Sequence, residues 1–321
     1  MNPDQVRNQL LNTMFSLRAA EFSRCFAPPP PCPLPAIRAH SVQNARSLDL
    51  LAVEGHVVAP TIRLDAEQGL SVELARVGRN QATTFSGLCP THDREIFAPI
   101  ETASVNPHDP QDRFLLAYRA TFYEVHATCA AAWQVQMGYL KRTELGLDPH
   151  DEPSRAGFFA VDRMIAAYET YRYKQLFDNA YLQRDFAILD HDVITLTVAE
   201  PTIAACALFS LDHIRRGDDV VRVCLTILPI EPGQTAALFS YVRADASLAR
   251  AELGRILTSS GARQKYELSR RLLNNCQNFT ISPRYVASWS PTKKKVITDF
   301  FVRTVIHDDL EFEHPDLSLF T

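Results

Sequence analysis

The sequence predicts an α+β protein in which helix-forming and strand-forming segments occupy separate stretches of the chain. Two observations predict this class. Residues 112–189 carry apolar side chains mostly three or four positions apart, which is typical of helices. Residues 193–242 contain four short runs rich in Val, Ile, Leu and Thr, separated by turn residues, which is typical of an antiparallel sheet. The length of 321 residues fits one large domain or two ordinary ones.

The first third of the chain, residues 1–110, is expected to form a small module organised by zinc. A helix over residues 5–24 is predicted to end beside Cys25, and a proline-rich stretch follows it. Alternating apolar and polar residues at 56–64 and 70–77 predict two strands.

Residues 111–190 are expected to form a helical hairpin. Two helices, 112–145 and 154–189, are predicted with a short Pro- and Asp-containing loop between them. Each helix would be about 45 Å long at 1.5 Å per residue.

Residues 191–321 are expected to form an α+β domain. Its antiparallel sheet is predicted from runs at 193–198, 203–209, 220–228 and 236–242, and helices are predicted to follow the sheet to the C-terminus.

Five side chains in the first third are the candidate zinc ligands, with His56 a less favoured sixth: Cys25, Cys32, His40, Cys89 and His92. Zinc prefers four Cys or His ligands in a tetrahedron, commonly as two close pairs from distant parts of the chain. The spacing of Cys89 and His92 lets two side chains of one turn reach one ion. We therefore expect Zn²⁺ to be bound by the three cysteines and by either His40 or His92, although buried thiols and ordinary loop histidines are the simpler alternative.

The zinc ion is expected to be structural. Asp93 and Glu95 adjoin His92, and a catalytic zinc would need an open position beside such a carboxylate. Acidic residues in the first turn of a helix also interact favourably with the positive end of the helix dipole, and this role requires no catalysis. A ligand set with two or three cysteines is typical of closed sites.

The residues around these ligands resemble an uncharacterised group of bacterial proteins. In that group a paired cysteine precedes an Ala-His-Ser/Thr-Ile/Val-Gln segment, a Gly-His-Val string, and a Phe-x-Gly-Phe-Cys-x-x-His-Asp string. The corresponding residues here are Ala39–Gln43, Gly55–Val57 and Phe85–Asp93, with Leu88 in place of the usual aromatic. The resemblance implies a metal site and a bacterial origin, and it implies no particular activity.

A metal-dependent nuclease of the ββα-metal (HNH-like) type is the enzymatic alternative. In such an enzyme a histidine activates water, and a divalent ion holds the scissile phosphate. His40 would be the base, with Asn44 and His56 as helpers. The sequence leaves open whether the protein is an enzyme.

The charge distribution suggests one class of partner. The net charge is −4, but residues 243–303 carry twelve Lys or Arg against four Asp or Glu, a local balance of +8. An acidic stretch follows, with Asp308, Asp309 and Glu311 among its residues. These charges are either solvated helix faces or an anion-binding surface, and the second interpretation predicts nucleic-acid binding.

Apolar runs in the sequence are too short to span a bilayer, and residues 1–24 lack the features of a secretion signal. We therefore expect no membrane partner and a cytoplasmic location. Taken together, the sequence predicts a zinc-stabilised binding protein that recognises a macromolecule. An oligomeric assembly component, with the long hairpin as the oligomerisation element, is a third possibility.

Overall fold

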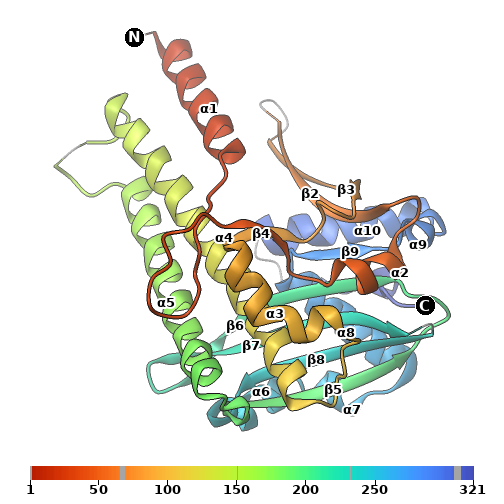
Figure 1. The fold of residues 1–321 in the computed structure, drawn as a ribbon. Helices are drawn as coiled ribbons and strands as arrows, with labels where there is room; N and C mark the ends of the chain where they lie inside the picture. The colour runs from red at the N-terminus through yellow and green to blue at the C-terminus, as the bar shows by residue number, and fades with distance from the viewer. Residues whose placement is uncertain (1, 66–68, 150, 232, 307–311) are drawn as a thin grey trace. The chain divides into compact units, whose positions relative to one another are not determined.

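The computed structural model describes residues 2–65, 69–149, 151–231, 233–306 and 312–321 (Figure 1). Helices account for 52% and strands for 24% of the chain, and the sheet is antiparallel, so the predicted α+β class is confirmed. The predicted acidic residues Asp308, Asp309 and Glu311 lie outside the described residues.

The chain forms two compact units that interleave along the sequence. Unit 1 contains residues 1–39, 85–95 and 121–184, and unit 2 contains residues 40–84, 96–120 and 185–321. The boundary between the units passes through two helices, because α3 and α4 each contribute residues to both. The expected succession of three domains, 1–110, 111–190 and 191–321, stays a prediction.

Unit 1 contains the helical hairpin and a two-stranded sheet. Its elements, including those shared with unit 2, are α1 (Pro3–Ala19), β1 (Ile37–His40), β4 (Thr84–Leu88), α3 (Pro90–Thr102), α4 (Pro110–Glu144) and α5 (Arg155–Gln183). Strands β1 and β4 pair with each other.

The two hairpin helices begin close to the predicted positions. Ser154 caps α5, because its hydroxyl accepts a hydrogen bond from the amide of Gly157 at 3.0 Å. The helix ends at Gln183, six residues before the predicted end at Leu189. Arg184 adopts a left-handed conformation with φ of 55°, which terminates the helical hydrogen bonds.

Unit 2 is built on a seven-stranded sheet in the order β3-β2-β9-β6-β7-β8-β5, in which every pair of neighbours is antiparallel. The strands are β2 (His56–Asp65), β3 (Gly69–Gly78), β5 (Leu189–Thr197), β6 (Ile203–Arg216), β7 (Asp219–Glu231), β8 (Gln234–Val242) and β9 (Phe279–Ile281). All four strands predicted between residues 193 and 242 are therefore present, each longer than predicted.

The short strand β9 joins the β2–β3 hairpin to strands β5–β8, and the sequence analysis did not predict it. It pairs with β6 through Ile203 and Ile281, and with β2 through Val58 and Ile281. The β2–β3 hairpin, predicted from the first third of the chain, therefore belongs to the same sheet as β5–β8.

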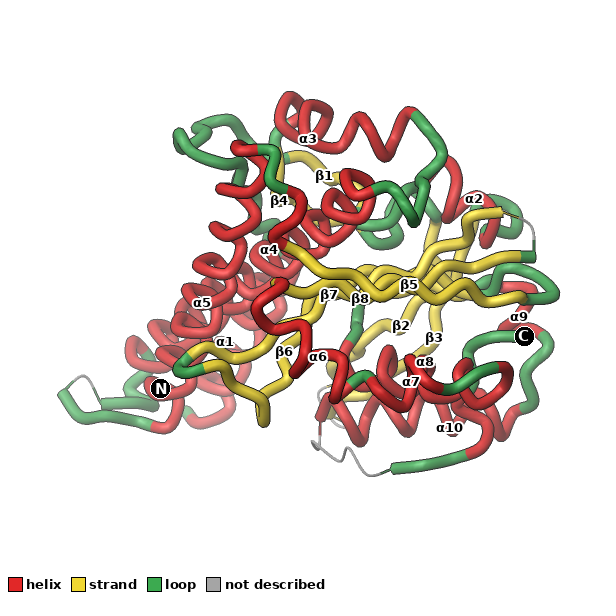
Figure 2. Tube along the Cα trace, turned by 90° about the horizontal axis from the view of Figure 1, so that it is seen from below, coloured by secondary structure: helices red, strands yellow, loops and turns green. Residues whose placement is uncertain are grey.

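Helices α6 (Ala246–Glu252), α7 (Gly254–Thr258), α8 (Gly261–Asn275) and α10 (Pro291–Phe301) cover one face of this sheet (Figure 2). The core contains apolar side chains of the sheet together with Leu253, Leu268, Leu272, Ile297 and Phe300. The helices and short turns of unit 2 are α2 (Asp49–Leu51), α6 (Ala246–Glu252), α7 (Gly254–Thr258), α8 (Gly261–Asn275), α9 (Pro283–Ala287) and α10 (Pro291–Phe301).

Candidate metal centre

Four of the five candidate ligands lie in two stretches of unit 1. Cys25 and Cys32 belong to the irregular stretch between α1 and β1, Cys89 separates β4 from α3, and His92 lies in the first turn of α3. Helix α1 ends at Ala19 rather than beside Cys25, so extended backbone brings this thiol into the site.

Strand β4 holds the Cys25 segment in place through its backbone. The amides of Arg24 and Phe26 donate hydrogen bonds to the carbonyl oxygens of Ser86 and Gly87, at 3.3 and 2.9 Å. A side chain at Gly87 would clash here, since a Cβ atom would lie 2.6 Å from the ring of Phe85. Glycine is thus required where β4 leads into Cys89.

Four of the five predicted residues form one compact group. The ligand atoms of Cys25, Cys32, Cys89 and His92 all lie within 4.8 Å of one another. His92 Nδ1 is 3.5 Å from Cys25 Sγ and 3.3 Å from Cys89 Sγ, and the sulfur atoms of Cys32 and Cys89 are 3.9 Å apart.

These spacings match a tetrahedral zinc site. With Zn–S of about 2.3 Å and Zn–N of about 2.0–2.1 Å, the edges of the tetrahedron are roughly 3.8 Å between two sulfurs and roughly 3.6 Å between sulfur and nitrogen. The observed separations of 3.9, 3.5 and 3.3 Å need only small adjustments to enclose an ion. The residues present therefore fit zinc.

Backbone amides stabilise thiolates at this site. Burial raises the pKa of Cys89, but hydrogen bonds from the His92 and Thr91 backbone and from the other two thiols outweigh burial, so its pKa lies below the usual value. Burial raises the pKa of Cys25, and the Cys89 amide, which donates to Cys25 Sγ at 3.3 Å, opposes this effect.

A buried ion pair lies in the same unit, and the sequence analysis did not single it out. Lys174 and Asp178, one turn apart on α5, are 0% and 2% exposed, and Nζ lies 2.5 Å from Oδ1. The ammonium also lies 4.4 Å from the centroid of the Phe122 ring. Burial lowers the pKa of Lys174, while Asp178 and the negative charge of a Cys25 thiolate favour the protonated form. Its only sequence mark is a Lys–Asp pair at i,i+4 spacing, which usually lies on a helix surface.

The group contains four protein ligands and no carboxylate. Four protein ligands fill a tetrahedron and leave no position for a reacting water. Glu101, a carboxylate downstream of His92, forms an ion pair with the buried Arg119 at 2.8 Å. The group thus has the number and type of ligands of a closed tetrahedral site.

His40 lies outside this group. It belongs to unit 2, where its Nε2 lies 3.2 Å from the carbonyl oxygen of Arg79, and burial lowers its pKa. His56, a proposed helper in the nuclease hypothesis, is exposed, and its Nδ1 lies 2.8 Å from the carbonyl oxygen of Glu54. Asn44 donates to Asn80 at 3.0 Å. Among the described residues, only the Cys25–Cys32–Cys89–His92 group has the spacing of a metal site.

No protein-family model, curated protein or solved structure matches the chain. No family is assigned. The function must therefore be argued from the chemistry of the chain's own residues.

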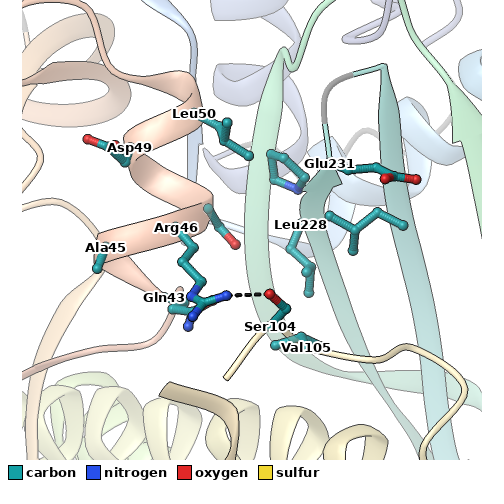
Figure 3. Close-up of a pocket in the computed structure, with 12 residues that line it drawn as sticks. Gln43, Ala45, Arg46, Asp49, Leu50, Ser104, Val105, Leu228 and Glu231 are labelled. Carbon is teal, nitrogen blue, oxygen red and sulfur yellow. Dashed lines mark hydrogen bonds between the residues drawn. The ribbon is translucent and has the colours of Figure 1, made fainter. Parts of the chain in front are cut away.

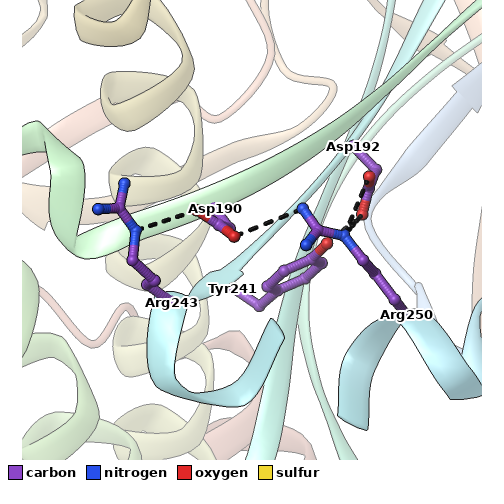
Figure 4. A network of polar contacts seen from close by, with 5 residues as sticks. All are labelled: Asp190, Asp192, Tyr241, Arg243 and Arg250. Carbon is purple, nitrogen blue, oxygen red and sulfur yellow. Dashed lines mark hydrogen bonds and ion pairs between the residues drawn. The ribbon is translucent and has the colours of Figure 1, made fainter. Parts of the chain in front are cut away.

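Ion pairs engage much of the basic segment 243–303. The network in Figure 4 is an example: Asp190 lies between Arg243 and Arg250, at 3.1 and 3.4 Å. Arg250 also pairs with Asp192 at 3.2 Å, and Tyr241 donates a hydrogen bond to Asp192. Further pairs in this region join Arg263 to Glu267, Arg270 to Glu313, Arg271 to Glu252, Arg284 to Glu200 and Lys295 to Asp299. Acidic residues from outside the segment thus neutralise part of its positive charge.

A hollow of about 310 Å³ lies in unit 2 (Figure 3). Arg46 points into it and donates hydrogen bonds to Ser104 and to the carbonyl oxygen of Thr102. Leu228 and Glu231 line the opposite side. The lining residues include the carboxylates of Asp49 and Glu231 but none of the five candidate metal ligands.

None of the described helices is long and apolar enough to cross a bilayer.

Proposed function

We propose that the chain is a zinc-stabilised binding protein, in which Cys25, Cys32, Cys89 and His92 hold one structural Zn²⁺. The observation that carries this proposal is the convergence of three thiols and one imidazole from two separate stretches of the chain, 25–32 and 89–92, to within 4.8 Å. Thiolate-rich tetrahedral sites select Zn²⁺ over hard cations such as Mg²⁺ and Ca²⁺.

The ion would fix the segment containing Cys25 and Cys32 to the turn between β4 and α3. Three thiolates and Zn²⁺ carry a net charge of −1. This role requires no chemical step, and the protein acts by binding.

The partner is a macromolecule, and the observations favour protein over nucleic acid. Nucleic-acid affinity depends on lysines and arginines free to replace counterions. Many basic residues of segment 243–303 are instead paired with carboxylates. Helix α5, in contrast, exposes many large apolar side chains, among them Phe158 and Tyr168 at 62% and 65% exposure. Apolar surface of this kind supports an assembly role for the helical hairpin.

The nuclease alternative has less support. Its base, His40, and its helper His56 each interact with a backbone carbonyl, and neither belongs to the metal group. The resemblance to a bacterial group, and with it the bacterial origin and cytoplasmic location, stays a prediction.

The first test is the metal content of protein purified without added metal, measured by mass spectrometry. We expect about one zinc per chain in the wild type and its loss in Cys89→Ser, accompanied by reduced stability. Cys129→Ser is the matched control, since Cys129 is a partly buried thiol on α4 outside the metal group, and it should retain the zinc. A folded wild-type protein without metal would refute the proposal.

A second pair of variants distinguishes the two candidate histidines. His92→Ala should lose zinc, whereas His40→Ala should retain it. Substitution with Co²⁺ gives a spectroscopic check, because a tetrahedral Cys₃His site produces strong visible absorption and sulfur-to-metal charge transfer. The opposite result, with zinc lost only in His40→Ala, would move the site to His40.

A further inference from the structure

One face of α5 exposes a continuous apolar stripe. Its members, which we call the α5 stripe, are spaced three or four residues apart along one side of the helix, except for one adjacent pair: Phe158, Val161, Met164, Ile165, Tyr168 and Tyr171. The opposite side of α5 is buried and includes Tyr173 and Phe177. The helix is therefore apolar on two sides. A helix that packs against the protein on only one side usually has a polar opposite side.

The stripe is large enough for a stable interface. Its side chains are between 37% and 65% exposed. At roughly 200 Å² of surface for a large apolar residue, this leaves about 600 Å² of apolar surface in water. A standard interface buries about 800 Å² on each partner, of which a little over half is apolar. The exposed apolar surface of the stripe therefore equals or exceeds the apolar area that one partner buries in a standard interface.

The composition of the stripe is also that of an interface. Aromatic residues, Met and Arg are enriched at interface cores, whereas Lys is depleted. Three of the six stripe residues are aromatic and one is Met, and Arg172 follows directly. The one lysine of α5, Lys174, is buried in unit 1.

We propose that the α5 stripe is the interface of a homodimer, in which the α5 helices of two copies pack antiparallel about a two-fold axis at Ile165. The proposal names the partner of the binding protein proposed above and rests on that function. A two-fold interface requires a patch that is complementary to itself. The stripe meets this condition because its ends lie almost equally far from Ile165, so that two antiparallel copies cover each other over about 20 Å.

The residues at the two ends strengthen this choice of partner. Phe158 and Arg172 each lie seven residues from Ile165, and a seven-residue step returns to nearly the same side of a helix. A two-fold axis at Ile165 therefore places Arg172 of one copy over Phe158 of the other. A guanidinium above an aromatic ring is a favourable cation–π contact.

The test is the oligomeric state of the full-length, zinc-loaded protein, measured by analytical ultracentrifugation across a concentration series. We expect a dimer in the wild type. Ile165→Glu places two like charges at the axis and should raise the dimer dissociation constant at least ~100-fold. Leu182→Glu is the matched control, because Leu182 is 57% exposed on the same helix but lies beyond the stripe, and it should leave the constant unchanged.

A photo-crosslinking residue tests the register directly. p-Benzoylphenylalanine in place of Ile165 should crosslink to α5 of a second copy, as mapped by mass spectrometry. A wild-type monomer at tens of micromolar would overturn the proposal, as would a dimer that survives Ile165→Glu or crosslinks outside α5. Zinc content is measured on every sample, so a monomer with one zinc per chain refutes the dimer and leaves the proposed metal site intact.

Discussion

The clearest pH effect is expected from His191, a largely buried residue of β5. Its Nδ1 lies 2.7 Å from the hydroxyl of Ser240 on the neighbouring strand β8. Burial, followed by the positive charge of Arg113, lowers the pKa of His191 to about 4, against 6.5 for a free histidine. The nearby carboxylates of Asp190 and Asp192 oppose this effect without overcoming it.

The sign and size of the effect follow from these two pKa values. The folded protein keeps His191 neutral down to about pH 4, whereas the unfolded chain protonates it below pH 6.5. Because the unfolded state binds more protons in this window, the free energy of unfolding falls as the pH falls from 6.5 to 4. With these two pKa values, protonation of His191 in the unfolded chain lowers the free energy of unfolding by about 2 kcal/mol at pH 5 relative to neutral pH.

Urea unfolding of the wild type and of His191→Asn at pH 7.5, 6 and 5 measures this loss. Asparagine retains a polar group for Ser240 but does not titrate. The difference in unfolding free energy between the two proteins should therefore shift by about 2 kcal/mol in favour of the variant between pH 7.5 and 5. Comparing two proteins at each pH cancels the effect of acid on the metal centre. A difference that stays constant with pH would refute the assignment.

The remaining predictions concern stability in urea or heat. Asp178→Ala removes the carboxylate that pairs with the buried Lys174 and should lower the free energy of unfolding by about 3–5 kcal/mol. In urea titrations the double variant Lys174→Met, Asp178→Leu should recover most of that loss. An Asp178→Ala variant as stable as the wild type would contradict this. Ser290 caps α10 by accepting a hydrogen bond from the Lys293 amide at 3.1 Å. Ser290→Ala should therefore cost about 1 kcal/mol in thermal unfolding, and an unchanged midpoint would show that the cap is dispensable.

Much of the fold could be predicted because local patterns determine it. Runs rich in Val, Ile, Leu and Thr between turn residues located the strands β5–β8, and the three- to four-residue spacing located the helical hairpin. Strand β9 could not be predicted, because three buried residues, Phe279–Ile281, carry no periodic pattern. Their strand conformation depends on pairing with β2 and β6, which are distant in sequence.

The sequence predicted the types of residue in the candidate metal site, but not which histidine belongs to it. Cysteine and histidine chemistry identified five residues, but spacing alone could not choose between His40 and His92. The structure groups His92 with the cysteines, because the β4–α3 turn places it one helical turn after Cys89. The sequence also could not predict which carboxylates form ion pairs with the basic residues of segment 243–303. Asp190 and Glu200, which pair with arginines of segment 243–303, lie more than 50 residues away in sequence from those partners.

The interleaved order of the two units gives the metal centre a topological consequence. Residues 40–84 form an excursion of the chain into unit 2, and the candidate ligands lie on both sides of that excursion. An ion held by Cys32 and Cys89 is therefore a cross-link across a sequence separation of 57 residues. In the chain-entropy model for cross-links, closing a loop of this length lowers the conformational entropy of the unfolded chain. This raises the free energy of the unfolded state by about 4 kcal/mol. Zinc bound in unit 1 would thus restrict the conformational search of residues 40–84 during folding, although no described residue of that stretch belongs to the metal group.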